Sequence, residues 1–372
     1  MKDGDLFNAD AQTLVNTVNT VGVMGKGIAL GFKKRFPAML RDYERRCALG
    51  EVRLGEPYLF KQAIPPWIVN FPTKEHWRGA ARLDAITDGL VRLRSQYRDW
   101  GITSIAVPPL GCGEGGLDWK VVGPTLYRYL SWFEIPVELY APWGTPDEEL
   151  TERFLSDSAR AATAGTLTRN PIPAAWVALA EILRRIHAEP YHYPVGHIGF
   201  QKLAYFATTV GLPTGLAFAR GSYGPFASDG KKVMNQLVNN GLLRETPVGQ
   251  MIRVDPGRTL DDARERHGAE LAGWEAEISR VVDLLVRMNG RQAELAATVH
   301  YAADEIARQT QRNPSEVEVL NAVLSWKARR TPPLGPTHVA EAVRKMNVAG
   351  WISAAYSAEC AETRRPGLRG RA

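Results

Sequence analysis

The sequence predicts an α/β domain with three layers (α/β/α) and a mixed sheet, followed by a second domain that is mainly α. Over residues 1–150, short apolar runs alternate with helix-like segments, and this alternation is typical of a sheet covered by helices on both faces. Beyond residue 174 the long segments carry helical spacing. The chain has 372 residues, of which 45% are hydrophobic, and is long enough for two domains.

Five segments of the first domain are expected to be strands because they are short and apolar, several of them on both faces. They are TLVNTV (13–18), PYLFKQ (57–62), PWIVNF (66–71), SIAVPP (104–109) and PVELYAP (136–142). Helical periodicity appears between them. The expected helices are GIALGFKKRF (27–36), AMLRDYERRCAL (38–49), RLDAITDGLVRLRSQYRDW (82–100), KVVGPTLYRYLSWF (120–133) and PDEELTERFLSD (146–157).

The domain boundaries follow from changes in composition. The first domain is expected over residues 1–157, and residues 158–173 are the linker candidate because they are small, polar and end in prolines. The second domain spans 174–360, and a basic tail that we expect to be disordered spans 361–372. Helices of the second domain are expected over 175–189, 197–212, 230–243, 260–289, 291–308, 315–329 and 337–350.

Composition excludes several classes of protein. The three cysteines lie far apart without C-x-x-C or Cys/His spacing, so we expect neither a disulfide framework nor a metal site. No apolar run is long enough to span a bilayer, and the start lacks a signal-peptide pattern. The chain is therefore expected to be cytoplasmic, with no membrane contact. Basic and acidic residues balance over 1–150, so the excess charge of +6 lies in the remainder, which permits nucleic-acid contact without requiring it.

The stretch VGVMGKG (21–27) lies between an expected strand and an expected helix. Its glycines allow the backbone to approach a ligand closely, and the helix start supplies N–H groups and a dipole that favour an anion. The spacing is neither that of a P-loop nor that of a dinucleotide-binding fingerprint. Alone, such a loop is equally well explained as a tight turn.

A second glycine cluster strengthens the phosphate interpretation. IAVPPLGCGEGGLDW (105–119) also runs from an apolar strand through a glycine-rich turn into a helix. Two such backbone nests can face each other and bind a diphosphate. Nearby, Asp5 can accept from an adenine amino group, and Asn16 and Asn19 can bind ribose hydroxyls.

Taken together, GDL (4–6), LVNTVN (14–19), GVMGKGIA (22–29) and PLGCGEGGLDW (109–119) resemble the macrodomain, an ADP-ribose-binding α/β/α module, over residues 1 to about 150. GVMGKGIALGFKKRFP and VNFPTKEHWRG are similar to the DarG-type antitoxins, in which a macrodomain removes ADP-ribose from DNA. The resemblance implies Asp5 at the adenine, the loops 22–27 and 111–116 at the phosphates and Asn19 near the distal ribose. The full set of expected binding residues is Asp5, Leu6, Asn19, Gly22, Val23, Met24, Gly25, Lys26, Gly27, Thr73, Gly111, Cys112, Gly113, Glu114, Gly115, Gly116 and Leu117.

The same resemblance implies that Lys74, in FPTK, is catalytic. Its amine would attack C1″ of the distal ribose, expel the base and leave a covalent adduct that water resolves. This requires an unprotonated amine, and the sequence leaves open whether burial or a neighbouring positive charge lowers its pKa. Asp118 matches a catalytic acidic position of the relatives, and the structural alternative is a carboxylate that stabilises the start of the next helix. No cofactor is expected.

Other residues near these motifs have two interpretations each. Glu75 and His76 are either proton carriers or solvent-facing neighbours of Lys74. Cys112 is better explained as a small residue in a tight loop than as a nucleophile. Trp77 and Arg78 either contact a flipped thymine or nearby DNA, or cap the loop.

The second domain loosely resembles toxin-neutralising antitoxin domains in its K-L-x-Y-F and Y-G-P-F elements. The DarG resemblance implies binding of the partner toxin, a DarT-like DNA ADP-ribosyltransferase, together with ADP-ribose and ADP-ribosylated single-stranded DNA as ligands. The excess of basic residues fits poorly with mimicry of DNA, so the sequence does not indicate which surface contacts the toxin. Two alternatives remain: a non-catalytic ADP-ribose reader, and a DNA-binding regulator with a helix-turn-helix from residue 315 that sets Arg329, Arg330, Arg344 and Lys345 at phosphates.

Overall fold

The structure is a computed structural model that describes residues 1–2, 4–156, 172–249 and 251–358. The chain forms two compact units, residues 1–172 with 231–241 and residues 173–230 with 242–372. The basic tail expected at 361–372 lies outside the described residues, as does the expected linker except for its last two residues. Within the described parts of the chain, none of the helices combines the length and apolar character that a bilayer span needs.

A five-stranded sheet with the order β2-β3-β1-β4-β5 forms the centre of the first unit. β3 pairs with β1, β1 with β4 and β4 with β5 in parallel, whereas β2 pairs with β3 in antiparallel orientation. The sheet is therefore mixed, as the sequence predicts. Its strands are β1 (Thr13–Asn19), β2 (Tyr58–Phe60), β3 (Trp67–Lys74), β4 (Ile105–Val107) and β5 (Val137–Leu139).

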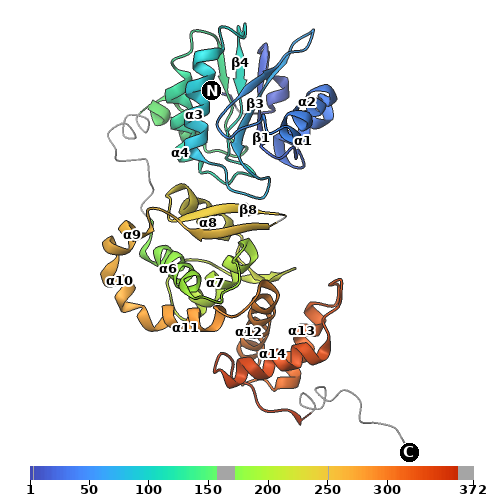
Figure 1. The fold of residues 1–372 in the computed structure, drawn as a ribbon, viewed down its shortest axis with the longest axis vertical. Helices are drawn as coiled ribbons and strands as arrows, with labels where there is room; N and C mark the ends of the chain where they lie inside the picture. Colours follow the sequence, from blue (N-terminus) through green and yellow to red (C-terminus); the bar gives the residue numbers. More distant parts are fainter. Residues whose placement is uncertain (3, 157–171, 250, 359–372) are drawn as a thin grey trace, which may run out of the picture. The chain divides into compact units, whose positions relative to one another are not determined.

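Helices cover both faces of this sheet. Figure 1 shows α3 and α4 on one face and α1 and α2 on the other. The bounds are α1 (Gly27–Arg35), α2 (Pro37–Ala48), α3 (Leu83–Gln96) and α4 (Trp119–Leu130), with short 3-10 helices η1 (Leu6–Asn8) and η2 (Asp147–Leu150). The helix expected at 146–157 is thus a 3-10 turn followed by α-helical residues 152–156.

Alternating side chains of the strands divide the core of the first unit in two. Val15, Val69 and Phe71 pack with the buried faces of α3 and α4, whereas Leu14 and Ile68 pack with those of α1 and α2. Successive residues of a strand point to opposite faces, so a strand that is buried on both faces must be apolar at consecutive positions. This explains why the apolar runs in these strands are continuous.

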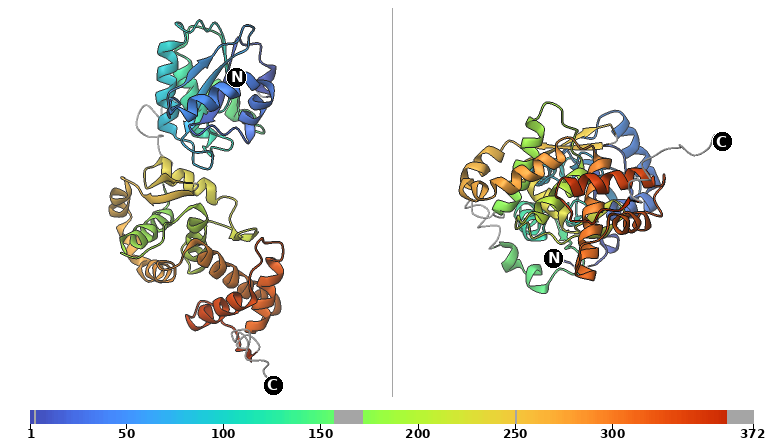
Figure 2. Two further views of the ribbon diagram at one scale, coloured as in Figure 1. Left: turned by 45° about the vertical axis from the view of Figure 1, so that its right-hand side comes forward. Right: turned by 90° about the horizontal axis from the view of Figure 1, so that it is seen from below.

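The second unit is mainly helical, as the sequence predicts. Figure 2 shows its helices from two further sides, with the last of them coloured orange to red. Its helices are α6 (Ala174–Ala188), α7 (His197–Thr209), α9 (Leu260–Arg266), α10 (Gly268–Gly273), α11 (Glu275–Leu285), α12 (Gly290–Thr310), α13 (Glu316–Trp326) and α14 (Pro336–Val348). α8 (Gly230–Asn239) also forms where a helix is expected, and its residues from Lys231 onward group with the first unit.

The segment expected as one helix over 260–289 is instead divided into α9, α10 and α11. The breaks fall at His267 and Trp274, whose backbones leave the helical region. Glycines 268 and 273 lie beside the breaks, and glycine weakens a helix because it loses more backbone entropy on ordering than other residues.

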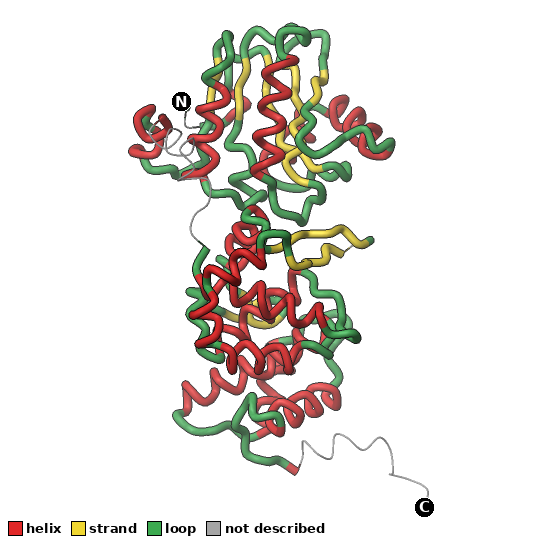
Figure 3. Tube along the Cα trace, turned by 60° about the vertical axis from the view of Figure 1, so that its left-hand side comes forward, coloured by secondary structure: helices red, strands yellow, loops and turns green. Residues whose placement is uncertain are grey.

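Two short hairpins, drawn as yellow strands in Figure 3, were not expected from the sequence. They are β6 (Ala219–Gly221) with β7 (Gly224–Phe226), and β8 (Leu243–Val248) with β9 (Met251–Pro256). Pro225 in one hairpin and Pro247 in the other obscure the strand pattern, because proline is a poor strand residue except at edges.

Two buried lysines bind the β6–β7 hairpin. Lys202 Nζ donates to the carbonyl of Pro225 at 2.7 Å, and Lys327 Nζ donates to the carbonyl of Ser222 at 2.7 Å and to Glu294 Oε1 at 2.9 Å. Burial lowers the pKa of Lys202 to about 8. Buried ammonium groups need such acceptors, so these contacts fix the hairpin to α7 and to the end of α13, where Lys327 also pairs with Glu294 on α12.

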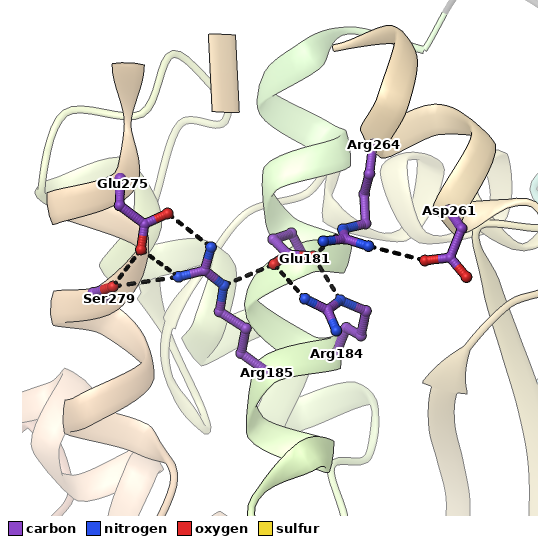
Figure 4. A network of polar contacts seen from close by, with 7 residues as sticks. All are labelled: Glu181, Arg184, Arg185, Asp261, Arg264, Glu275 and Ser279. Atoms are coloured by element: carbon purple, nitrogen blue, oxygen red, sulfur yellow. Dashed lines mark hydrogen bonds and ion pairs between the residues drawn. The ribbon is translucent and has the colours of Figure 1, made fainter. Parts of the chain in front are cut away.

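A buried carboxylate joins three helices of the second unit (Figure 4). Glu181 on α6 accepts two hydrogen bonds from Arg184, at 2.8 Å each, and one from Arg185, at 2.7 Å. Its Oε2 also lies 2.7 Å from Nε of Arg264 on α9. Arg185 continues to Glu275 on α11, with contacts of 2.6 and 2.7 Å. Burial alone would raise the pKa of Glu181, but the arginines outweigh it and lower the pKa.

We predict that Glu181→Gln destabilises the second unit by about 3–5 kcal/mol, because it leaves half-buried guanidinium groups without their shared charge. Chemical denaturation of the intact chain measures this loss. The matched control is Glu275→Gln, whose more exposed side chain should cost less than about 1 kcal/mol. Since the pKa of Glu181 is lowered on folding, its contribution is present above the unfolded pKa near 4.5 and is lost as the pH falls through the lower folded value. Equal losses of unfolding free energy for Glu181→Gln and Glu275→Gln at pH 7 would refute the stabilising role of the Glu181 network.

Candidate functional site

The carboxyl ends of β1 and β3 bring Asn19 and Lys74 together. The two strands run parallel, and Asn19, the last residue of β1, is paired with Lys74, the last residue of β3. A register irregularity lies between Val18 and Asn19. Because side chains at the carboxyl ends of parallel strands face the same edge of a sheet, the chain places an amide and an amine side by side there.

Asn19 shapes the first glycine loop. Its Oδ1 accepts hydrogen bonds from the amides of Val21 and Val23, at 3.0 and 3.3 Å, and its Nδ2 donates to the carbonyl of Val23 at 2.6 Å. The loop then turns through Gly22, whose φ of +80° suits glycine. Asn19 is only 4% exposed, and its side chain contacts the backbone of the loop and the hydroxyl of Tyr43.

The first loop ends at the start of α1. Lys26 occupies the N-cap position without a side-chain cap, and the first turn contains no acidic residue. Among the described residues, the amides of Gly25, Lys26 and Gly27 donate to no protein acceptor. An uncapped helix start with exposed N–H groups is a favourable place for an anion.

The second glycine loop is closed by its own backbone. The amide of Leu117 donates to the carbonyl of Gly111 at 2.9 Å, and that of Gly116 donates to Gly113 at 2.9 Å. A Cβ at Gly115 would lie 2.5 Å from the carbonyl oxygen of Gly111, so only glycine fits there. In the described part of the chain, the amides of Gly113, Glu114 and Gly115 have no protein acceptor, which is the arrangement of an anion-binding nest.

Lys74 and the two loops converge. Lys74 Nζ donates to the carbonyls of Trp77, at 3.2 Å, and of Glu114 in the second loop, at 3.4 Å. A Cβ built at Gly27 in the first loop would lie 3.7 Å from Cγ of Glu114. The amine, the uncapped helix start and the second nest therefore meet at one edge of the sheet.

The two acidic residues predicted in the site both cap helices. Asp5 Oδ1 accepts from the amide of Phe7 at the start of η1, at 3.0 Å, and its other oxygen lies 3.9 Å from Arg35. Asp118 Oδ1 accepts from the amide of Lys120 at the start of α4, also at 3.0 Å. The capping role that was the structural alternative for Asp118 is therefore present in the structure. In both residues the second carboxylate oxygen can still accept from other partners.

The remaining residues predicted to bind ADP-ribose differ in burial. Leu6, Met24 and Thr73 are buried at 2–3% exposure, whereas Val23, Gly25, Lys26, Gly27, Gly113 and Glu114 are exposed. Burial raises the pKa of the Cys112 thiol, which disfavours a thiolate nucleophile. The exposed members lie on the two loops, whereas the buried ones lie in η1 (Leu6), in the first loop (Met24) and in β3 (Thr73).

Three supporting residues were not identified from the sequence. The hydroxyl of Tyr43 on α2 donates to the backbone carbonyl of Asn19 at 2.8 Å and is near its Oδ1 at 3.1 Å. The amide of Ala81 donates to Gly115, and both donors of Thr20 bind the carbonyl of Glu75. Only Tyr43 carries a signal: it is a polar aromatic four residues after Met39 on the buried face of its helix.

Three of the four basic residues of the proposed helix-turn-helix contact carboxylates. Arg344 forms two short contacts with the buried Glu316, at 2.6 and 2.7 Å, Lys345 pairs with Glu341 at 2.8 Å, and Arg330 lies 3.8 Å from Glu294. This geometry disfavours phosphate contacts by these side chains.

Comparison with known proteins agrees with this architecture. The Macro domain family model matches residues 15–126. A DNA ADP-ribosyl glycohydrolase of Mycobacterium tuberculosis is 39% identical over 231 residues, which are 60% of this chain and 62% of that protein. This chain therefore matches less than two thirds of that relative's length. A DNA ADP-ribosyl transferase-DNA ADP-ribosyl glycohydrolase fusion protein of Thermosipho africanus is 40% identical over 42% of this chain and 45% of its own.

The longest of these matches extends through both units. A DNA ADP-ribosyl glycohydrolase of Thermus aquaticus is 34% identical over 307 residues, which cover 80% of this chain and 81% of the relative. A match of this extent includes the macrodomain and much of the helical region. From the converging loops, the matching family model and this relative, we conclude that the chain belongs to the DarG family of DNA ADP-ribosyl glycohydrolases.

Proposed function

We propose that the first unit removes ADP-ribose from thymidine bases of single-stranded DNA by hydrolysing the N-glycosidic bond at C1″. The observation that carries this proposal is the convergence of Lys74 with the two glycine loops: its Nζ lies 3.4 Å from the carbonyl of Glu114, whose side chain approaches Gly27. A diphosphate bound by the backbone amides of both loops would leave the distal ribose beside Asn19 and Lys74. The names of the relatives support DNA-linked ADP-ribose as the substrate.

The reaction we propose has two steps. The Lys74 amine attacks C1″, a bond forms between Nζ and C1″, and the bond from C1″ to the base nitrogen breaks. The base leaves with the bonding electrons and takes up a proton, for which Asp118 is the proposed acid-base partner. Water then adds to C1″ of the adduct, the bond to Nζ breaks and ADP-ribose is released.

The geometry supports further roles for residues that would bind ADP-ribose. Asp5 is proposed at the adenine, where its second carboxylate oxygen can accept from the amino group. The amides of Gly25–Gly27 and Gly113–Gly115 are proposed at the phosphates. Asn19 would act on the ribose mainly by positioning the loop, since its side-chain oxygen already accepts from Val21 and Val23.

For the second unit we propose direct binding and neutralisation of a DarT-like DNA ADP-ribosyltransferase toxin. The Thermosipho africanus relative joins a transferase and a glycohydrolase in one chain, which supports a functional pairing of the two activities. The DNA-binding regulator is less well supported, because Arg330, Arg344 and Lys345 all contact carboxylates.

We predict that Lys74→Ala abolishes release of ADP-ribose from modified single-stranded DNA while free ADP-ribose binds within about tenfold of wild type, because the amine acts on C1″ and the loops bind the diphosphate. Release is followed by chromatography and binding by calorimetry. The same variant should bind the purified toxin as tightly as wild type. The matched control is Lys120→Ala, an exposed lysine paired with Glu149 at 3.2 Å. Equal release by wild type and Lys74→Ala would exclude the catalytic role.

We also predict that Gly113→Val weakens ADP-ribose binding at least tenfold without loss of stability. A Cβ at Gly113 meets no protein atom within 4 Å and φ there is not positive, so the fold tolerates a side chain, whereas a ligand on the loop would meet it. Calorimetry measures the affinity and thermal denaturation the stability. The control is Gly268→Val, at a glycine of α10 with equally open surroundings. Unchanged affinity in Gly113→Val would place the diphosphate elsewhere.

A further inference from the structure

The five residues after β3 form a closed turn beside Lys74. The carbonyl of Glu75 accepts from both the amide and the hydroxyl of Thr20, at 3.1 and 2.8 Å, which fastens this turn to the end of β1. The amide of Gly79 donates to His76 at 2.9 Å, and the amide of Arg78 donates to His76 Nδ1 at 3.2 Å. The turn is therefore tied to the end of β1 at its first residue and closed by hydrogen bonds within itself, and Trp77 lies at its centre.

Trp77 is part of a stack of planar groups. The His76 ring stacks on the indole with a centroid separation of 5.5 Å and an interplanar angle of 30°. The guanidinium carbon of Arg78 lies 4.4 Å from the indole centroid, within the range of a cation–π contact. Despite these neighbours Trp77 is 42% exposed.

This exposure argues against a simple capping role. Trp119, the first residue of α4, packs into the core and is only 6% exposed. A second tryptophan resembles Trp77 without sharing its place: Trp132 is 39% exposed and lies under Arg94, with the guanidinium carbon 4.7 Å from the ring. Trp132 follows the carboxyl end of α4, whose twelve residues extend about 18 Å from the second loop. Exposure and a contact with an arginine therefore do not by themselves distinguish Trp77 from Trp132.

The position of Trp77 relative to Lys74 is the feature that distinguishes it. Lys74 Nζ donates to the backbone carbonyl of Trp77 itself, at 3.2 Å, and to that of Glu114. An indole and a guanidinium are both planar groups on which nucleobases stack, and the positive charge favours the adjoining phosphodiester. The stack is therefore built on a residue whose backbone carbonyl the amine contacts.

We propose that the stack of Trp77 and Arg78 receives a nucleobase of the DNA strand while Lys74 acts on the attached sugar, an inference that rests on the function proposed above. Trp77 is then a positioning residue: it selects DNA-linked ADP-ribose over other ADP-ribose conjugates. The base is either the modified one or its neighbour in the strand, and both offer the same stacking chemistry.

The test uses the intact chain and three probes: free ADP-ribose, ADP-ribosylated thymidine and a single-stranded oligonucleotide with one ADP-ribosylated thymidine. Trp77→Ala should raise KM for the oligonucleotide by roughly tenfold with little change in kcat. Affinity for free ADP-ribose should change less than twofold. Trp77→Phe should restore most of the loss, and the matched control Trp132→Ala should leave KM unchanged.

The mononucleoside distinguishes the two sources of the base. An equal rise in KM for ADP-ribosylated thymidine assigns the stack to the modified base, whereas a rise only with the oligonucleotide assigns it to a neighbouring base. An unchanged KM with both probes overturns the proposal, as does an equal loss of affinity for free ADP-ribose, which would mean that Trp77 only supports the loop.

Direct binding separates this inference from the proposed reaction. The dissociation constant of the ADP-ribosylated oligonucleotide is measured for Lys74→Ala and for the Lys74→Ala, Trp77→Ala double variant, and the second change should weaken binding roughly tenfold. If wild type releases no ADP-ribose but this difference is present, the proposed reaction fails and the stack is supported. If turnover is normal and the difference is absent, the stack is excluded.

Discussion

The parallel pairing of β1 with β3 is the constraint on which the site depends. It places Asn19 opposite Lys74 at the carboxyl edge of the sheet, and each residue then organises the loop that comes after its strand. Asn19 binds the backbone of the first loop through Val21 and Val23, and Lys74 reaches the carbonyls of Trp77 and Glu114. A one-residue slip of β3 against β1 would turn the Lys74 side chain to the other face and separate the amine from the loops.

The loops themselves contribute mainly backbone. Gly22, Gly111 and Gly116 have φ values of +72° to +80°, and the amides of Gly25–Gly27 and Gly113–Gly115 point to no acceptor among the described residues. A receptor made of amides suits a diphosphate, because it supplies donors without a fixed positive charge and leaves Lys74 for chemistry. Buried charges in the second unit have another use: Glu181, Lys202 and Lys327 fix helices and a hairpin in place.

The sequence predicted the features that depend on local chemistry. The continuous apolar runs marked the strands of the sheet, and the glycine spacing marked both loops, because each signal lies within a few residues. The features it missed depend on distant partners. Glu181 lies in a helix that is apolar on nearly every side. Arg184 and Arg185 are local to it, but its contact with Arg264 on α9 and the contact of Arg185 with Glu275 on α11 join residues far apart in the sequence. Likewise, nothing local to FPTKEHWRG indicates that Lys74 ends β3 and contacts Glu114, forty residues later.

The central claim is that the Lys74 amine forms a bond with C1″ during turnover. An amine adduct of a ribose can open to an imine, which borohydride reduces to a stable secondary amine. The most direct measurement is therefore reduction with borohydride during turnover of an ADP-ribosylated oligonucleotide, followed by peptide mass spectrometry. We expect ADP-ribose attached at Lys74 in wild type and no attachment in Lys74→Arg, which keeps the charge without a comparable nucleophile. Full turnover by wild type with no label at Lys74, or continued turnover by Lys74→Arg, would contradict the covalent role of this amine.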